Sequence, residues 1–486
     1  MPLPKREAGF YLTGRLGGDG RVLREAVQTG GEVQKGGAGG RAGEAFRVAM
    51  FLGLLLTLAV NVPGQMSLDS VVSLTEARSG VRQTWAPAIS SWVLKPFDHL
   101  VAGTGLYVAA SSALLFLSLM SLTRLRPRTT WIAVALGVLA VLTPQVLIYQ
   151  GIVWRDVLFA NLSVAGFVLL AHAAERWGAR PPALPLAGAL ICLAMAGLAR
   201  QNGLVLAVVA ALVLAWTVRA DGWRRILAWG LGGLAAVVVL AFGLNLLAQP
   251  AQTSPTLKAD LGFRVLQHYD IVGAKAHHPG LRLKEIGNAD PAAAALIERQ
   301  GPTLYDPSRV DTLDSDPAFR RTLWHVPAKA ISAQWRRIVV HYPAAYALQR
   351  ADVFRWTFLT PKLEACLPVQ VGVVGPADQI ADLDIQAGVS PQNQGVMAYA
   401  RRFFGTPVFS HLTWAVVSLG LIAWLSRRAA PADGAMIGLL AGSLLFAASF
   451  AVISVACDYR YLYLVDLSAM VGLLYAALDP PRWRRF

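Results

Sequence analysis

Long apolar runs separated by short polar segments dominate the chain. Ten of these runs are long enough, as helices, to cross about 30 Å of hydrocarbon, where every backbone polar group must be satisfied internally. The runs cover residues 46–62, 104–123, 131–149, 156–174, 183–199, 203–218, 226–247, 409–426, 435–456 and 460–478. The pattern predicts an all-α polytopic membrane protein of about ten transmembrane helices.

Two segments interrupt the alternation of apolar run and short loop, 63–103 and 249–408. The second is as long as an ordinary domain, and it contains helical patterns such as 327–356 but no long alternating run. We therefore expect a mainly helical domain over 249–408. It lies between an N-terminal membrane domain of about seven helices, 46–248, and about three C-terminal membrane helices, 409–486.

The first 45 residues are rich in glycine, mixed in charge and without an apolar core. Such a composition does not resemble a cleavable signal sequence. We expect residues 1–45 to be a disordered cytoplasmic tail. The alternative is that they precede a true start at Met50.

Composition and charge agree with a membrane protein and define its orientation. The chain is 55% hydrophobic and 15% charged, which is too apolar for a set of soluble domains. Arginines are concentrated in loops on one side, at 124–128, 175–180, 219–225, 426–428 and 479–486. Because lysine and arginine mark the cytoplasmic side, the net charge of +15 indicates topology and not a nucleic-acid surface. Both termini are then cytoplasmic, and the two long segments are periplasmic.

The first long segment contains a short amphipathic helix that begins at Leu68. Asp69, Ser73 and Glu76 share one face of it, and Gly80 ends it. We expect this helix to lie at the membrane interface. A second piece, 85–101, carries aromatic residues typical of the headgroup level. Trp85 is therefore read first as an anchor, with contact to a substrate as the less favoured alternative.

Polar residues beside the apolar runs collect on the side that carries few arginines. They come from four loops and are Asp69, Arg155, Asp156, Arg200, Gln201, Asn202, Asp458, Tyr459 and Arg460. Each could be an ordinary charge at the headgroup level. Adjacent arginine and aspartate in VWRDVLFA and ACDYRYLY, however, indicate ion pairs that orient an arginine.

This cluster suits a phosphate that is held at the membrane edge by a lipid tail. Arginine binds phosphate in a bidentate manner, and a nearby carboxylate such as Asp69 can act as a general base on an incoming hydroxyl. The sequence contains no P-loop, Rossmann glycine pattern or kinase motif, which argues against a nucleotide-dependent reaction. These residues therefore predict group transfer from an isoprenoid phosphate carrier.

Metal and disulfide signals are weak. His277 and His278 are adjacent in a Pro-Gly turn and lack a metal-ligand spacing, so the sequence requires no cofactor, although a divalent cation is left open. The three cysteines are Cys192, Cys366 and Cys457. We expect no structural disulfide from this odd set, with a Cys366–Cys457 pair as the alternative.

Several of these stretches resemble a known family. QMSLDSVVSLTEARSG and TWAPAISSW, with VWRDVLFA, LARQNGL and DYRYLY, are similar to segments of the GT-C superfamily. These are integral membrane glycosyltransferases that use polyprenyl-phosphate sugars, and they include the protein mannosyltransferase and aminoarabinose transferase group. The resemblance implies that Asp69 is the catalytic or metal-associated carboxylate. The chain departs from the family at Asp69-Ser70, where an acidic pair is usual, and at Ala86-Pro87-Ala88, where His-Pro-Pro is usual.

The hypothesis is a glycosyltransferase in a bacterial inner membrane, acting at the periplasmic face on an envelope glycan, lipid or protein acceptor. Asp69 is the base. The donor phosphate is bound by Arg200 and Arg460, and Arg155 is a further candidate for this role. Orienting or supporting roles are assigned to Asp156, Asp458, Asn202, Glu76, Tyr459 and Trp85. The expected partners are a polyprenyl-phosphate-linked sugar, the acceptor and membrane lipids, and not nucleic acid. The alternatives are a transporter or flippase of lipid-linked saccharide and a non-catalytic envelope scaffold.

Overall fold

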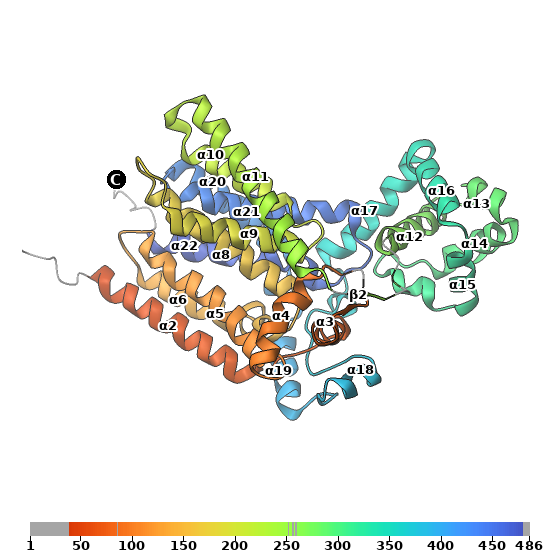
Figure 1. Cartoon of the computed structure of the whole chain (residues 1–486), viewed down its shortest axis with the longest axis horizontal. Coiled ribbons are helices and arrows are strands. Elements are labelled where there is room, and N and C mark those ends of the chain that lie inside the picture. Colours follow the sequence, from red (N-terminus) through yellow and green to blue (C-terminus); the bar gives the residue numbers. More distant parts are fainter. Residues whose placement is uncertain (1–37, 85, 251, 255–256, 258–259, 480–486) are drawn as a thin grey trace, which may run out of the picture.

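The protein is an all-α polytopic membrane protein with a helical unit outside the membrane bundle (Figure 1). The computed structural model describes residues 38–84, 86–250, 252–254, 257 and 260–479. The bundle consists of α2 (Ala38–Asn61), α5 (Gly105–Ser121), α6 (Trp131–Leu142), α7 (Pro144–Leu147), α8 (Arg155–Glu175), α9 (Ala183–Ala199), α10 (Val205–Thr217), α11 (Trp223–Ala248), α20 (His411–Arg428), α21 (Asp433–Ile453) and α22 (Tyr463–Leu478).

The predicted count of about ten spans is not confirmed, although all ten apolar runs fall on helices. Within the described residues, six helices are long and apolar enough to cross a membrane, and the bent pair α6–α7 would make a seventh. Helix α9 and the 13-residue α10 are shorter. At 1.5 Å per residue α10 extends roughly 20 Å, less than the thickness of the hydrocarbon core. Length alone therefore does not make each apolar run a complete span.

The bend between α6 and α7 has a local cause. Thr143 has an extended backbone, and Pro144 begins α7 at the position where a missing N–H costs nothing. The two pieces meet at 65°. The apolar run 131–149, predicted as one straight helix, is thus a broken one.

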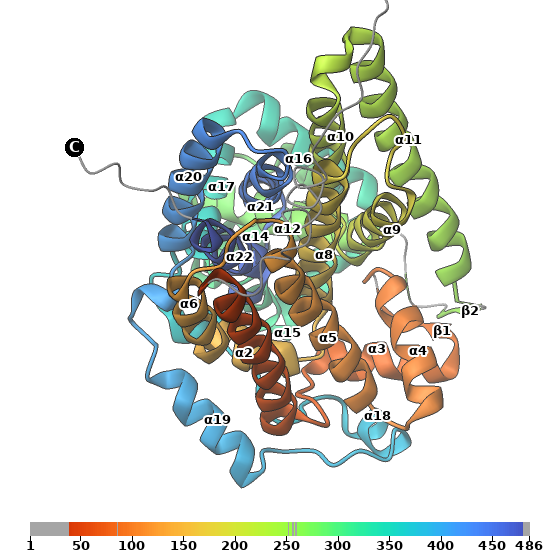
Figure 2. The same cartoon turned by 90° about the vertical axis from the view of Figure 1, so that its left-hand side faces the viewer.

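Helix α8 forms the centre of the bundle. It packs against α5, α9, α21 and α22, and nearly all of its apolar length is buried inside the protein. Helices α2 and α11 are at the periphery, and few of their apolar side chains are buried inside the protein (Figure 2). Because α8 begins with Arg155 and Asp156, the central helix brings two charged residues to the middle of one end of the bundle.

The last residues of the predicted tail belong to the bundle. Helix α2 begins at Ala38, so residues 38–45 are helical and the predicted disordered tail 1–45 is wrong for this part. Ala42, upstream of the apolar run, is fully buried like Phe46 and Met50, so the packed face of α2 continues into this part. The rest of the predicted tail, residues 1–37, lies outside the described residues.

Short elements cover the end of the bundle where α8 begins. They are α3 (Leu68–Ser79), β1 (Val81–Arg82), α4 (Ile89–Leu100) and β2 (Gln252–Thr253). Strands β1 and β2 pair in parallel, with Val81 opposite Gln252. The predicted short helix that begins at Leu68 and ends at Gly80 is confirmed. Gly80 adopts a left-handed conformation, and its N–H donates to the carbonyl of Glu76.

The helices between α11 and α20 belong to two different hydrophobic cores. We call residues Leu261–Leu359 the cap. The cap comprises α12 (Leu261–His277), α13 (Lys284–Ala289), α14 (Pro291–Leu304), α15 (Pro317–His325), α16 (Ala328–His341) and α17 (Pro343–Leu359), which enclose a core of their own. Then α18 (Ala377–Asp382) and α19 (Pro391–Arg401) follow, and their apolar residues belong to the core of the bundle. In Figure 1 the cap projects from the end of the bundle that carries α3 and α4.

Candidate functional site

Four segments meet at the end of the bundle beneath the cap. Asp69 lies in the first turn of α3, and Arg155 and Asp156 begin α8. Arg200 is the residue that follows α9, and Arg460 lies in the short 3-10 turn Tyr459–Leu462 before α22.

Helix α3 is fixed to the segment before α8 by its own N-terminal residues. Ser67 and Ser70 form a capping box, and the Ser70 hydroxyl donates to the carbonyl of Val153 at 2.7 Å. The Trp154 indole N–H donates to the Ser67 hydroxyl at 3.0 Å. Asp69 therefore lies at a helix N-terminus, where a carboxylate is favoured, and these hydrogen bonds set its position relative to α8.

A chain of ion pairs joins the four segments. Arg460 donates from Nη2 to Asp69 Oδ2 at 2.7 Å and to Asp458 Oδ2 at 3.1 Å. Its Nε lies 3.9 Å from Asp156 Oδ2, and the other oxygen of Asp156 pairs with Nη1 of Arg200 at 2.8 Å. The structure thus brings Asp69, Asp156, Asp458, Arg200 and Arg460 together, with Arg460 at the centre.

Aromatic rings hold the two arginines from the other side. The guanidinium of Arg460 lies 4.8 Å from the ring centre of Trp154, and that of Arg200 lies 5.0 Å from Tyr461. A cation above an aromatic face is attracted by the ring quadrupole. Both guanidinium groups are therefore preorganised.

A disulfide lies directly before Asp458, which corrects the expectation of no structural disulfide. Cys366 and Cys457 are bonded, and Cys192 is the free cysteine. The partners are 91 residues apart in sequence, so no local spacing indicates the bond. It forms because the chain that returns from the cap runs beside the segment leading to α22.

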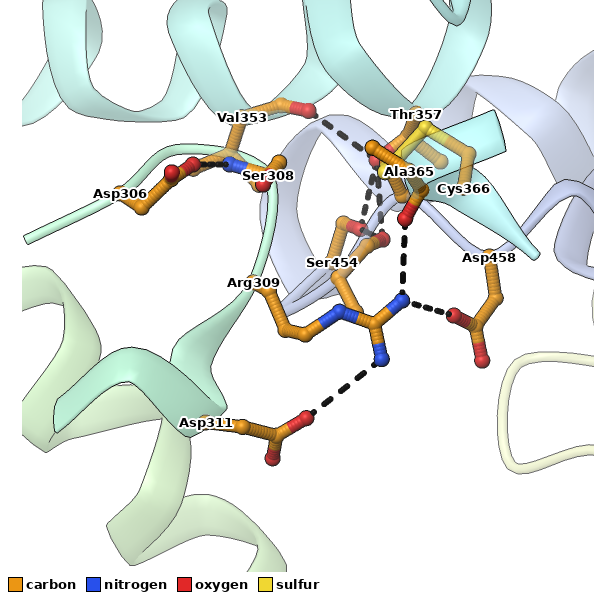
Figure 3. Close-up of a disulfide and its surroundings, with 12 residues drawn as sticks. Asp306, Ser308, Arg309, Asp311, Val353, Thr357, Ala365, Cys366, Ser454 and Asp458 are labelled. Atoms are coloured by element: carbon orange, nitrogen blue, oxygen red, sulfur yellow. Dashed lines mark hydrogen bonds and ion pairs between the residues drawn. A yellow bond between two sulfur atoms is a disulfide. The ribbon is translucent and has the colours of Figure 1, made fainter. Parts of the chain in front are cut away.

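The cap contacts the same segment through Arg309. Figure 3 shows the Arg309 side chain directed toward Asp458, with bonds to its Oδ1 at 3.1 Å and to the carbonyl of Ala365 at 3.2 Å. The backbone of Cys457 also donates to the carbonyl of Ser308. Asp458 is therefore shared between an arginine of the cap and Arg460.

Tyr459 points away from the ion pairs, into the bundle. Its hydroxyl donates to Asp466 Oδ2 at 2.7 Å, and the other oxygen of Asp466 lies 2.8 Å from Nδ1 of His411. All three side chains are fully buried. Tyr459 thus fixes the turn from which Arg460 projects, and it does not line either cavity described below.

Two other predicted supporting residues have structural partners. Glu76 accepts from the backbone N–H groups of Gln83 and Thr84 and from the hydroxyl of Ser91, so it holds the loop after α3 and does not face Asp69. Asn202 donates to the Ser449 hydroxyl and ties the loop after α9 to α21. Trp85 lies outside the described residues.

Sequence reasoning did not identify Trp154, Arg309, His411 or Asp466. Trp154 had a usable signal, because it directly precedes Arg155 in VWRDVLFA. Arg309 had none, since it lies in the cap among many arginines. His411 and Asp466 stood at the beginnings of predicted helices, where single polar residues are common.

Two cavities adjoin the ion-pair chain, and Arg155 lines both. The first, which we call the Asp69 cavity, has a volume of about 280 Å³ and contains Asp69, Arg155 and Arg460 with hydroxyl groups such as Ser90. The second, the Arg200 cavity, has a volume of about 220 Å³. It is lined by Arg155 and Arg200 and otherwise mainly by apolar and aromatic residues of α12, α21 and the loop after α21.

Asp69 is held in its charged form. Its side chain is 46% exposed. Partial burial raises the pKa of Asp69, but the positive charges of Arg460, Arg155 and Arg200 outweigh this effect and hold the pKa below its ordinary value. Asp69 is therefore ionised at neutral pH and can accept a proton or stabilise positive charge.

The arrangement does not fit a divalent cation. In the part of the chain that the structure describes, no three His, Cys, Asp or Glu side chains converge on one point. Arg460 lies among Asp69, Asp156 and Asp458 and takes the place that a metal ion would need. No step of the chemistry proposed below involves a metal.

Comparison with known proteins adds one distant likeness. No protein-family model and no curated protein matches the chain. Among solved structures, it resembles the crystal structure of the oligosaccharyltransferase of Archaeoglobus fulgidus in the apo form, with a TM-score of 0.38 and 13% sequence identity. The match covers 88% of this chain and 50% of that one, so the chain spans about half the length of that enzyme.

Proposed function

We propose that the protein is a glycosyltransferase. It moves a sugar from a polyprenyl-phosphate donor to an acceptor hydroxyl of an envelope glycan, lipid or protein, at the periplasmic face of the inner membrane. The observation that carries the proposal is the chain of ion pairs from Asp69 through Arg460 and Asp156 to Arg200, with a cavity on each side of Arg155.

The Arg200 cavity has the properties that a lipid phosphate requires. Its charged lining residues are Arg155 and Arg200, and its aromatic and aliphatic lining includes Phe263, Leu266 and Tyr461. Arginine binds phosphate in a bidentate manner, and the apolar wall suits the first isoprene units. In this proposal the donor phosphate lies beside Arg155 and the sugar extends into the Asp69 cavity.

The chemical step transfers one sugar and one proton. The acceptor oxygen bonds to the anomeric carbon, and the bond from that carbon to the phosphate oxygen breaks, with its electron pair remaining on the phosphate. Asp69 accepts the hydroxyl proton, while Arg155, Arg200 and Arg460 stabilise the departing phosphate. Asp156 and Asp458 act as positioning residues that hold the guanidinium groups.

The test compares Asp69→Asn with wild type in proteoliposomes that contain a panel of polyprenyl-phosphate hexoses and pentoses and an envelope extract as acceptor. We expect sugar transfer and polyprenyl phosphate release to fall on the order of 10²–10⁴-fold, as for loss of a general base. Asp382→Asn, an exposed aspartate of α18, removes the same charge outside the site and should not change the rate.

Two outcomes would contradict the proposal. An Asp69→Asn protein that inserts normally and transfers sugar at the wild-type rate refutes the assignment of Asp69. Movement of intact lipid-linked saccharide between leaflets, without release of polyprenyl phosphate, identifies the alternative, a transporter or flippase.

A further inference from the structure

A second basic cavity lies at the opposite end of the bundle, far from Asp69. It has a volume of about 420 Å³ and is formed by α5, α8 and α9, near the turn Leu122–Arg124. Figure 2 views the molecule from this end and shows α5 and α9 on either side of α8. We call this cavity the Arg124–Arg176 groove, after the two arginines that line it.

The arginines at this end of the bundle include some with a carboxylate partner and some without one. Arg126 lies 3.3 Å from Asp479, and Arg428 is paired with Asp433. Arg124 and Arg176 form no ion pair with any residue that the structure describes, and both are exposed. Their charges are available to an anion from outside the protein.

Further groups at this end also favour an anion. Helix α9 begins at Ala183 after Pro182, and no side chain caps its first N–H groups. Uncapped N–H groups and the helix dipole attract negative charge. At the inner side of the groove the His172 ring lies 3.1 Å from the Ser121 hydroxyl, so polar atoms continue inward from the arginines.

The rest of the groove is apolar and continues on the surface of the bundle. Leu117 on α5 and Leu184 on α9 line it and are 61% and 88% exposed. In a membrane, such side chains contact acyl chains. A free phosphate would make no use of this surface, whereas a lipid uses the arginines and the leucines together.

We propose that the Arg124–Arg176 groove binds an anionic diacyl phospholipid of the leaflet on the arginine-rich side. The headgroup phosphate pairs with Arg124 and Arg176 beside the start of α9, and an acyl chain lies along Leu117 and Leu184. Charge complementarity indicates this ligand, because basic pockets between membrane helices bind anionic headgroups of the surrounding lipids. This site is independent of sugar transfer at Asp69.

The experiment counts phosphatidylglycerol molecules retained by the full chain in native mass spectrometry after purification in detergent with that lipid. We expect wild type to retain one lipid molecule, and Arg124→Gln/Arg176→Gln to retain about tenfold less at the same lipid concentration. The control is Arg224→Gln/Arg225→Gln, which removes two charges from the start of α11 on the same side, outside the groove. It should retain lipid as wild type does.

Competitors distinguish the possible sources of phosphate. Phosphatidylcholine, sodium phosphate and farnesyl phosphate, each added at the concentration of phosphatidylglycerol, should leave its retention unchanged. Displacement by sodium phosphate would identify a free-anion site, and displacement by farnesyl phosphate an isoprenyl site. Either result, equal retention of phosphatidylcholine, or equal retention by the two double variants would overturn the proposal.

Discussion

At the scale of single residues, Arg460 contacts the Asp69 carboxylate and lowers its pKa. It pairs with Asp69 at 2.7 Å and is the arginine with the largest effect in holding the pKa of Asp69 below its ordinary value. A carboxylate with a low pKa remains ionised in mildly acidic solution. The acid limb of the proposed activity should therefore lie at unusually low pH.

Arg460→Gln tests this dependence. Loss of the positive charge raises the pKa of Asp69, so the residual activity should begin to fall at a higher pH than in wild type. Arg460→Lys keeps the charge and should keep the limb near its original position. The measurement is the pH profile of kcat/KM. Identical limbs in the two variants would show that Asp69 is not the titrating group.

Loss of the Asp156 carboxylate should destabilise the protein strongly. It is 2% exposed and lies between Arg200 and Arg460, so Asp156→Asn leaves two buried guanidinium groups without their common partner. Breaking a buried ion pair costs about 3–5 kcal/mol, and Tm in detergent should fall clearly. Asp221→Asn, which breaks the exposed pair with Arg225, should cost about 1 kcal/mol or less. Equal Tm shifts would contradict this expectation.

At the scale of elements, the C-terminus of α3 depends on one glycine. Gly80 has φ of 69°, in the left-handed region where a Cβ is unfavourable. Gly80→Ala should destabilise the protein by roughly 1 kcal/mol, measured by thermal unfolding. Gly395→Ala is the control, because Gly395 lies inside α19 with open space around it, and alanine favours a helix there. A Gly80 variant as stable as wild type would show that the left-handed C-terminus of α3 is dispensable.

At the scale of the whole molecule, the cap and the segment that directly follows it contact the residues that lead to α22. The disulfide joins Cys366 to Cys457, Arg309 reaches Asp458, and Arg350 of α17 donates to the carbonyls of Val452 and Ser454. All three contacts converge on the segment that leads to Arg460. The position of the cap therefore determines the position of the central arginine of the site.

Removal of the disulfide tests this coupling. The free energy of unfolding of Cys366→Ala/Cys457→Ala should be about 4–5 kcal/mol lower than that of wild type in the chain-entropy account, because the bond closes a loop of 91 residues. Cys192→Ala should leave stability nearly unchanged, since Cys192 is the free cysteine. Thiol labelling of unfolded wild type should find one reactive cysteine before reduction and three after. Three before reduction would contradict the disulfide.

The sequence by itself determined the class of the protein, because an apolar run can be recognised from the local sequence alone. Each of the ten predicted runs is helical, and the short helix that begins at Leu68 ends where Gly80 predicts. The number of complete spans did not follow, because the run 131–149 is broken at Thr143-Pro144 and α10 has only 13 residues. The disulfide was missed because its cysteines approach each other only after the cap has folded.

Most polar residues of the site could also be predicted from the sequence, because charged residues beside membrane helices are rare. Their pairing was decided by the tertiary structure. Asp69 and Arg460 are 391 residues apart in sequence. Glu76, on the same predicted face as Asp69, instead accepts hydrogen bonds from the loop after α3. Local patterns specify which residues are costly to bury and where helices begin and end. Which charge meets which is decided by packing around α8 and by the contacts of the cap, because an ion pair depends on distances that no local pattern encodes.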